Sequence, residues 1–481
     1  MTEAYWIKAF IHKYRSMSLP VRAAFWFAVC NVMLKGIQFI TVPIFTRLMA
    51  DEEYGRLSVF LTYEQMLYIL ATWEIQMGAY QKGIFKFKEE TYDFTAAAQF
   101  LINILTVICF AFAAVFHSWI TAETGMPVSV ITAMFIFFLL QPSYQCWLVQ
   151  KRTSYAYKEA VSVTFLYSLL NIFVSLGALI LFGRTAVIKY ISSTVMSSVI
   201  SLFFFIRHVN YLSVKKENMI KYWRFLLRFE APLVLHSLSY LILSQADRIM
   251  IAKMAGNAQT AYYGAAYSLA SVISLFQNSV NQSLLPWRYQ KLEQKEYQAV
   301  RQVTNRLLAA IGTVILSFIL AAPEIMSILF PQSYQEAVWC IPPISVSVYF
   351  MFLYTLFVNI ETYYEKTHYV MYVSLFCGAV NIILNYWGIL MFGYLACAYT
   401  TLFSYVLFAL GHFYFMKRTI KGKVSTDKII DQKMTVLISC AMIAASVLLT
   451  VMYQYFMLRY GVFLLLLVIW SLKRHKGKRD F

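Results

Sequence analysis

Long apolar stretches separated by short polar breaks fill nearly the whole chain. A helix needs ~20 apolar residues to cross a bilayer, and backbone polar groups cannot stay unpaired in lipid. Barrel strands would be shorter and would alternate, so the pattern predicts an all-α integral membrane protein. We predict fourteen spanning helices, at residues 23–45, 57–80, 95–116, 127–149, 160–182, 186–206, 229–252, 261–284, 306–330, 337–360, 369–391, 394–416, 434–455 and 458–472.

Composition agrees with this pattern. Hydrophobic residues make up 60% of the 481 positions and charged residues 13%, whereas about a quarter of a soluble domain is charged. Much of the surface must therefore face lipid. The seven cysteines lie in or beside apolar stretches and form no CxxC or Cys/His ligand spacing, so we expect no disulfide framework, metal or cofactor. The first residues lack the pattern of a cleaved signal peptide.

The basic residues fall mostly on one side of the predicted membrane. With fourteen spans both termini share a side, and 33 of the 41 Lys and Arg lie there. Six lie on the opposite side, and Lys35 and Arg248 lie within spans. The positive-inside rule then predicts an inner (cytoplasmic) membrane protein with both termini in the cytoplasm. The basic C-terminal tail agrees with this topology and with attraction to membrane lipids, and RNA binding is the less favoured alternative.

The chain resembles itself at an offset of about 200 to 214 residues. The matched segments are residues 46–55 with 247–264, 151–155 with 365–369, and 171–183 with 381–393. Six helices separate the copies, so both enter the membrane from the same face. We therefore predict two six-helix bundles related by a pseudo-two-fold axis along the membrane normal, with a site between them. The predicted domains are residues 1–212, residues 213–418, and residues 419–481, which hold a linker, two extra helices and the tail.

Cationic side chains recur at matching positions of the repeat. Lys35 falls on His236, and Arg47 falls on Arg248. Ionisable residues at membrane depth are costly and are functional candidates by default. Four such groups lining one cleft would suit an anion such as pyrophosphate, because Arg matches phosphate oxygens and Lys acts as a point charge. We therefore predict that these four residues bind substrate.

Each of these residues also has a structural explanation. Arg248 follows Asp247, and acidic residues follow Arg47, so either arginine can form a salt bridge at the outer rim. A lone membrane histidine such as His236 often only bonds to a neighbouring helix. Lys35 and Arg47 also lie about 120° apart on an ideal helix, unless Pro43 bends it.

Acidic residues in the spans are candidates for ion coupling. Glu64 and Glu74 lie in the predicted second helix about 80° apart, so that one face can carry both. A carboxylate in a low-dielectric site can exchange a proton. Asp247 is a third candidate. Neutralisation of Lys35 across the bundle is the alternative role for the two glutamates.

The segments TRLMADEEYG (46–55) and SQADRIMIAKMAG with YYGAAYSLA (244–270) resemble the oligosaccharide flippase family of bacterial polysaccharide export. That family belongs to the multidrug/oligosaccharidyl-lipid/polysaccharide exporter superfamily, and the resemblance in helix count and repeat layout extends over residues 20–472. It implies a V-shaped, MATE-like pair of bundles. It also implies transport of oligosaccharide repeat units on undecaprenyl pyrophosphate to the outer leaflet by alternating access, driven by a cation gradient or membrane potential. Lys35, Arg47 and Arg248 match the family's cationic cavity residues.

Other functions remain open at this point. A peptidoglycan- or teichoic-acid-precursor flippase shares the predicted architecture, and a multidrug/cation antiporter would favour a more acidic cavity. A polytopic polysaccharide polymerase or ligase usually needs a long outer loop, and the outward connections here are short, so we expect no enzyme and no catalytic residues. A polymerase and glycosyltransferases of the same pathway are possible partners; nucleic acid is not expected.

Overall fold

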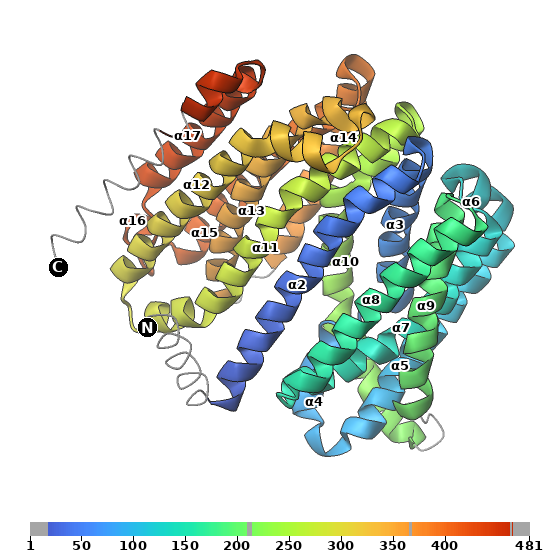
Figure 1. Cartoon of the computed structure of the whole chain (residues 1–481). Coiled ribbons are helices and arrows are strands. Elements are labelled where there is room, and N and C mark those ends of the chain that lie inside the picture. Colours follow the sequence, from blue (N-terminus) through green and yellow to red (C-terminus); the bar gives the residue numbers. More distant parts are fainter. Residues whose placement is uncertain (1–17, 209–213, 365–367, 462–463, 465–481) are drawn as a thin grey trace, which may run out of the picture. The chain divides into compact units, whose positions relative to one another are not determined.

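A computed structural model describes residues 18–208, 214–364, 368–461 and 464. These residues are almost entirely helical and contain no strand (Figure 1). The long helices are α2 (Leu19–Leu48), α3 (Asp51–Thr72), α5 (Thr91–Val115), α7 (Val128–Thr153), α8 (Tyr157–Phe182), α9 (Ala186–His208), α10 (Lys216–Met254), α11 (Asn257–Glu293), α12 (Tyr297–Leu329), α13 (Ile341–Tyr363), α14 (His368–Phe392), α15 (Ala396–Ile420) and α17 (Gln432–Val451). Short elements are α4 (Ala79–Lys86), η1 (Lys88–Glu90), α6 (His117–Thr124), η3 (Gln332–Cys340), α16 (Thr426–Ile429) and η4 (Met452–Gln454). The predicted all-α fold is confirmed.

Among the described residues, eleven helices are long and apolar enough to cross a membrane. Thirteen of the fourteen predicted spans fall on a long helix; α3 and α11 are long but less apolar than the rest. The last predicted span, 458–472, lies mostly outside the described residues. Two predicted boundaries differ clearly. The helix predicted at 57–80 ends at Thr72, and the one predicted at 229–252 already begins at Lys216.

The chain forms two compact units. Unit 1 contains the described residues up to Thr41 together with Leu48–Leu238, and unit 2 contains Val42–Arg47 and the described residues from Ser239 onward. The division falls inside α10, so this helix contributes its first half to unit 1 and its second half to unit 2. The predicted symmetry between two bundles stays a prediction.

Two matched positions of the sequence repeat make the same local structure. Asn171 on α8 donates its Nδ2 to Ser197 Oγ on α9 at 2.8 Å, and Asn381 on α14 donates to Ser404 Oγ on α15 at 3.1 Å. Both matched segments also end in a glycine with positive φ directly after the helix. A buried amide that bonds across a helix pair fixes the rotation of one helix against the other. The repeat therefore specifies the same helix-pair contact twice.

The core of unit 1 gathers aromatic rings around the start of α5. Phe94 stacks on Tyr80 with a centroid distance of 5.6 Å and packs edge-on against Tyr222 of α10. All three rings are fully buried. Gly83 in α4 lies directly over Phe94, because a Cβ at that position would come within 2.1 Å of Phe94 Cζ. The close approach of α4 to α5 therefore requires glycine.

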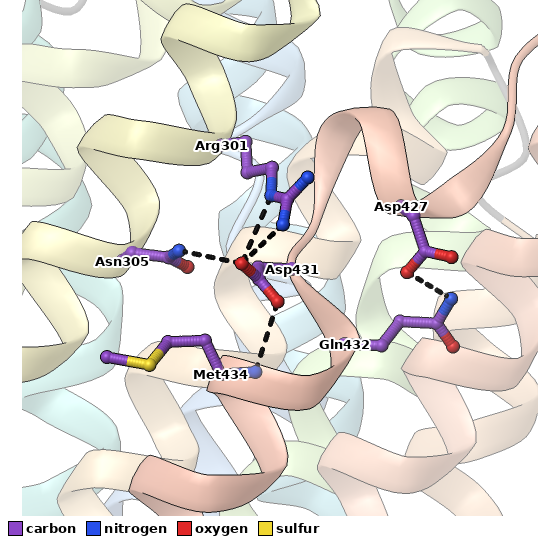
Figure 2. A network of polar contacts seen from close by, with 6 residues as sticks. All are labelled: Arg301, Asn305, Asp427, Asp431, Gln432 and Met434. Atoms are coloured by element: carbon purple, nitrogen blue, oxygen red, sulfur yellow. Dashed lines mark hydrogen bonds and ion pairs between the residues drawn. The ribbon is translucent and has the colours of Figure 1, made fainter.

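The core of unit 2 is centred on α13, which packs against α15, α11, α12 and α17. The additional helix α17 is fixed to α12 at both ends. At its start, Asp431 accepts bonds from Arg301 Nη2 at 2.5 Å and from the Met434 N–H at 3.1 Å (Figure 2). Beyond its far end and after η4, Arg459 forms an ion pair with Glu324 of α12. The described residues after the repeat are thus part of unit 2.

Candidate functional site

In unit 1, the chain between α3 and α4 is a break within a predicted membrane span. Trp73 and Glu74 both have positive φ, at 53° and 49°, so the α-helical hydrogen-bond ladder stops there. Side chains of α5 cover the end of α3, with Thr106 Oγ1 donating to the Ala71 carbonyl at 3.2 Å and Cys109 Sγ lying 3.9 Å from the Leu70 carbonyl. Backbone groups freed by a helix break need such partners in a low-dielectric environment.

Glu230 of α10 covers the other side of the break. It is 3% exposed, and its Oε2 accepts the Ala79 N–H at 2.7 Å, at the start of α4. A carboxylate is well placed there, because the first N–H groups of a helix have no partner within the helix and carry a partial positive charge. Gly78 allows the approach, since a Cβ there would lie 2.9 Å from both Glu230 oxygens. Sequence reasoning gave Glu230 no role.

Glu74 lies inside this break and not on a helix face. The predicted helix geometry that placed Glu64 and Glu74 on one face is therefore wrong, because α3 ends two residues before Glu74. The Glu74 side chain bonds to Ser237 and interacts electrostatically with Glu230. The break thus brings together two carboxylates from α10 and the segment after α3.

Glu64 is held separately, near the middle of α3. Tyr190 of α9 donates its hydroxyl to Glu64 Oε2 at 2.5 Å, and Lys189 interacts electrostatically with the same carboxylate. The alternative role predicted for Glu64 is neutralisation of Lys35, whereas the lysine that interacts with this carboxylate in the structure is Lys189. The structure leaves the proposed coupling role of Glu64 untested.

Lys35 and His236 both lie in unit 1. Lys35 is exposed near the middle of α2, and within the described chain its Nζ bonds only to Gln38 Oε1, at 3.1 Å. This lysine has no acidic partner in that part of the molecule. His236 is partly buried on α10. Their roles in substrate binding stay predictions.

Arg47, Asp247 and Arg248 belong to unit 2. Arg47 Nη2 donates to the Ile328 carbonyl at 2.7 Å, at the C-terminal end of α12. Arg248 is partly buried, donates to Gln245 Oε1 at 2.7 Å and lies 4.8 Å from the centre of the Tyr267 ring.

Asp247 is 1% exposed and accepts the Tyr263 hydroxyl. Its other carboxylate oxygen accepts the Arg248 backbone N–H at 2.9 Å, and the two side chains also interact electrostatically. The alternative of a local charge interaction between these neighbours therefore has support. The proposed ion-coupling role of Asp247 is untested.

Two further features of unit 2 were missed by sequence reasoning. Arg288 was counted among the topology charges, yet it lies in α11 and is 3% exposed. Within the described chain, its Nε and Nη1 have no hydrogen-bond acceptor. Glu361 and His412 form a pair that is 0% exposed on both sides. The signal available in the sequence was only a lone histidine within an apolar stretch and an acidic residue at the end of another.

An open cavity of about 820 Å³ lies where α12 begins, and Lys295, Arg301 and Lys428 are among its lining residues. Asp431 already neutralises Arg301 there (Figure 2). In the described part of the chain, no group of three or more His, Cys, Asp or Glu side chains is placed to hold a metal ion.

The long apolar helices and the charged groups within them define a multi-pass membrane protein. Its fold is the one shared by transporters of the MOP superfamily. The chain belongs to the polysaccharide biosynthesis protein family, whose model matches residues 21–290. A second family model, described as MatE, matches residues 232–387.

Curated relatives cover part of the chain. A protein of the Lsg locus of Haemophilus influenzae is 23% identical over 281 residues, which cover 56% of this chain and 66% of the relative. An uncharacterized membrane protein of the same species is 21% identical over 275 residues, which cover 56% and 65%. The chain thus spans just under two thirds of the length of these relatives.

Solved structures extend the likeness to nearly the whole chain. The lipid II flippase MurJ, in an inward closed conformation, has a TM-score of 0.66 at 13% identity and covers 95% of this chain and 99% of its own. An inward-facing MATE family multidrug resistance transporter has a TM-score of 0.60 at 12% identity and covers 82% and 100%. At such identities the likeness is one of fold.

Proposed function

We propose that this protein is a flippase that moves oligosaccharide repeat units linked to undecaprenyl pyrophosphate from the cytoplasmic to the outer leaflet. It acts by alternating access, coupled to a cation gradient or to the membrane potential, and catalyses no covalent reaction. The observation that carries the proposal is the match of the polysaccharide biosynthesis family to residues 21–290, on a fold shared with a lipid II flippase. A polymerase and glycosyltransferases of the same pathway are its proposed partners.

Arg288 supports an anionic substrate. Removing a guanidinium from water costs several kcal/mol unless an anion or other acceptors compensate it. Two of its nitrogens have no acceptor within the described residues, so the described part of the chain holds a buried cation whose hydrogen bonds it does not complete. Arginine binds phosphate oxygens through paired, charge-assisted hydrogen bonds. A pyrophosphate headgroup is the part of the proposed substrate that supplies those acceptors.

The other proposed substrate-binding residues are Lys35, Arg47, His236 and Arg248. Lys35 fits best, because it has no acidic partner among the described residues. Arg47 already donates one nitrogen to a helix end, and Arg248 lies against Gln245 and Tyr267. Glu64, Glu74 and Asp247 are the proposed ion-coupling residues.

A peptidoglycan-precursor flippase is the second candidate, favoured by the likeness to MurJ over 95% of the chain. Both substrates would present a pyrophosphate to Arg288, so the sugar distinguishes them. Purified protein in proteoliposomes should flip a fluorescent undecaprenyl-pyrophosphate-linked oligosaccharide faster than lipid II. The reverse preference would favour the second candidate, and transport of a cationic dye alone would favour a multidrug antiporter.

Arg288→Met separates a binding role from a structural one. We expect flipping to fall about 10- to 100-fold, because charge-assisted bonds contribute about 1.5–3 kcal/mol each. The thermal unfolding midpoint should stay equal or rise, since the variant removes an uncompensated buried charge. Arg306→Met, an exposed position on α12, is the matched control and should change neither quantity. A lower unfolding midpoint with unchanged flipping would show that Arg288 is structural.

A further inference from the structure

Glu361 and His412 meet at the interface of α13 and α15 in unit 2. His412 Nδ1 lies 3.2 Å from both carboxylate oxygens of Glu361. Both side chains are 0% exposed. A completely enclosed pair of titratable groups is costly to maintain and rarely arises from packing alone.

Two aromatic rings of the described chain also contact the imidazole. The Tyr354 ring stacks on it at 5.6 Å and 28°, and the Phe408 ring packs edge-on at 4.7 Å. The Tyr354 hydroxyl bonds to Tyr240 of α10. Titratable groups near the same end of the neighbouring helices are Arg288 and Tyr289 on α11, Arg301 on α12, Tyr363 on α13, Tyr369 on α14, Lys417 on α15 and Lys433 on α17. Of these, Arg301 is paired with Asp431, and Tyr369 stacks on Phe415.

The second ring nitrogen of His412, Nε2, takes no part in the contact with Glu361. This nitrogen is buried and bonds to no group in the described chain. When Nδ1 carries the proton and donates to Glu361, Nε2 is an acceptor without a donor, and leaving a buried polar atom unpaired costs about 1–3 kcal/mol. One proton added at Nε2 turns the imidazole and carboxylate into an imidazolium–carboxylate pair. The Glu361 carboxylate compensates the positive charge of the imidazolium, so the pair can hold one exchangeable proton, although the new Nε2–H has no acceptor in the described chain.

We propose that the Glu361–His412 pair is a proton-binding site that couples transport to proton movement. This inference rests on the proposed function and goes beyond it by naming the proton as the coupling ion and by adding a site to the proposed coupling residues Glu64, Glu74 and Asp247. In the present conformation no water reaches the pair, because both side chains are fully enclosed. A proton can enter or leave only when α13 and α15 separate locally. Proton exchange is then tied to a change in conformation, as coupling requires.

A neutral buried network in the same unit provides a control. Asn381 of α14 donates to Ser404 of α15, and Asn385, also on α14, donates to Asn381. These side chains are also 0% exposed, but none of them titrates. Asn381→Ala should therefore lower stability by the same amount at every pH, whereas a variant of a titrating pair changes the pH profile itself.

The first experiment measures proton binding without transport. Thermal unfolding midpoints of the purified full chain in detergent are recorded from pH 5 to pH 8 for wild type, His412→Gln, Glu361→Gln and Asn381→Ala. If the folded pair binds a proton more tightly than the unfolded chain does, the wild type gains stability relative to either pair variant as pH falls from 8 to 5, while the Asn381→Ala difference stays constant. A constant offset, or a wild type that loses stability relative to both pair variants as pH falls, would overturn the proposal, because the folded pair would then not bind the proton.

The second experiment measures coupling. Proteoliposomes containing fluorescent undecaprenyl-pyrophosphate-linked oligosaccharide are assayed with and without an imposed pH gradient. Without a gradient, both pair variants should still flip the substrate. The stimulation of flipping by the gradient should be about tenfold smaller in the variants than in the wild type. Wild-type stimulation in both variants would overturn the coupling role and leave the flippase assignment intact. Absence of flipping by the wild type would instead refute the proposed function, whereas the unfolding profiles would still decide whether the pair binds a proton.

Discussion

In unit 1 the second helix stops at Thr72 and the chain resumes a helix at Ala79, whereas its predicted counterpart in unit 2, α11, runs unbroken from Asn257 to Glu293. The break in unit 1 frees backbone groups, and polar side chains are used to cover them. Glu230 caps the new helix, and Thr106 covers a carbonyl of the old one. The continuous helix needs no such help.

The two units also differ in how their charged side chains are paired. In unit 1, Glu64 is bound by Tyr190 and Glu230 by the Ala79 backbone. In unit 2, Arg288 on the continuous helix keeps two nitrogens without an acceptor in the described chain. Helices that the sequence repeat matches therefore do not use their polar groups in the same way. Side chains that satisfy a backbone are structural, while side chains left unsatisfied are the better candidates for binding.

The largest effect that tests this comparison comes from paired glycine substitutions. Gly83→Ala places a Cβ 2.1 Å from Phe94 within a stack of buried rings, so we expect a loss of about 1–3 kcal/mol in the free energy of unfolding. Gly312→Ala in α12 meets only the flexible end of Met442, at 2.9 Å, and should cost much less. Thermal unfolding in detergent measures both. Equal losses would show that the α4 contact is no tighter than the contact in unit 2.

An intermediate effect is expected at the cap of α4. Glu230→Ala leaves the Ala79 N–H without its acceptor, which should cost about 0.5–2 kcal/mol. Hydrogen exchange should speed up across α4 and stay unchanged in α11. Glu217→Ala, at an exposed position of the same helix α10, is the matched control. Unchanged exchange in α4 would mean that the break does not depend on this carboxylate.

The smallest effect concerns the attachment of α17 in unit 2. The Arg301 guanidinium, followed by the Met434 N–H, lowers the pKa of Asp431. Because the folded pKa is below the unfolded value of about 3.9, the stabilisation is complete above that pH and is lost as pH falls through the folded value. Asp431→Asn should therefore lower the unfolding midpoint slightly at pH 7, and the difference from wild type should shrink toward pH 3. A difference that is independent of pH would contradict this ion pair.

The sequence by itself determined the helices and their repetition. Apolar length predicted thirteen helices that the structure contains, because backbone groups in lipid leave few alternatives to a helix. The matched segments also carry Asn171 and Asn381 at corresponding positions, and the structure shows that each of them bonds to the neighbouring helix. Such features depend on local pattern, and local pattern is fully present in the chain.

Only the tertiary structure decided where the helices break and which charges find partners. Glu230 caps the helix that follows the break after Thr72, and it lies 151 residues further along the chain than the Ala79 amide that it binds. Arg288 looked like a loop charge, and burial by other helices made it a candidate for binding an anion. Glu361 and His412 were unremarkable as single residues and became a site through packing of α13 on α15. Burial and pairing are long-range properties, so no local pattern in the sequence encodes them.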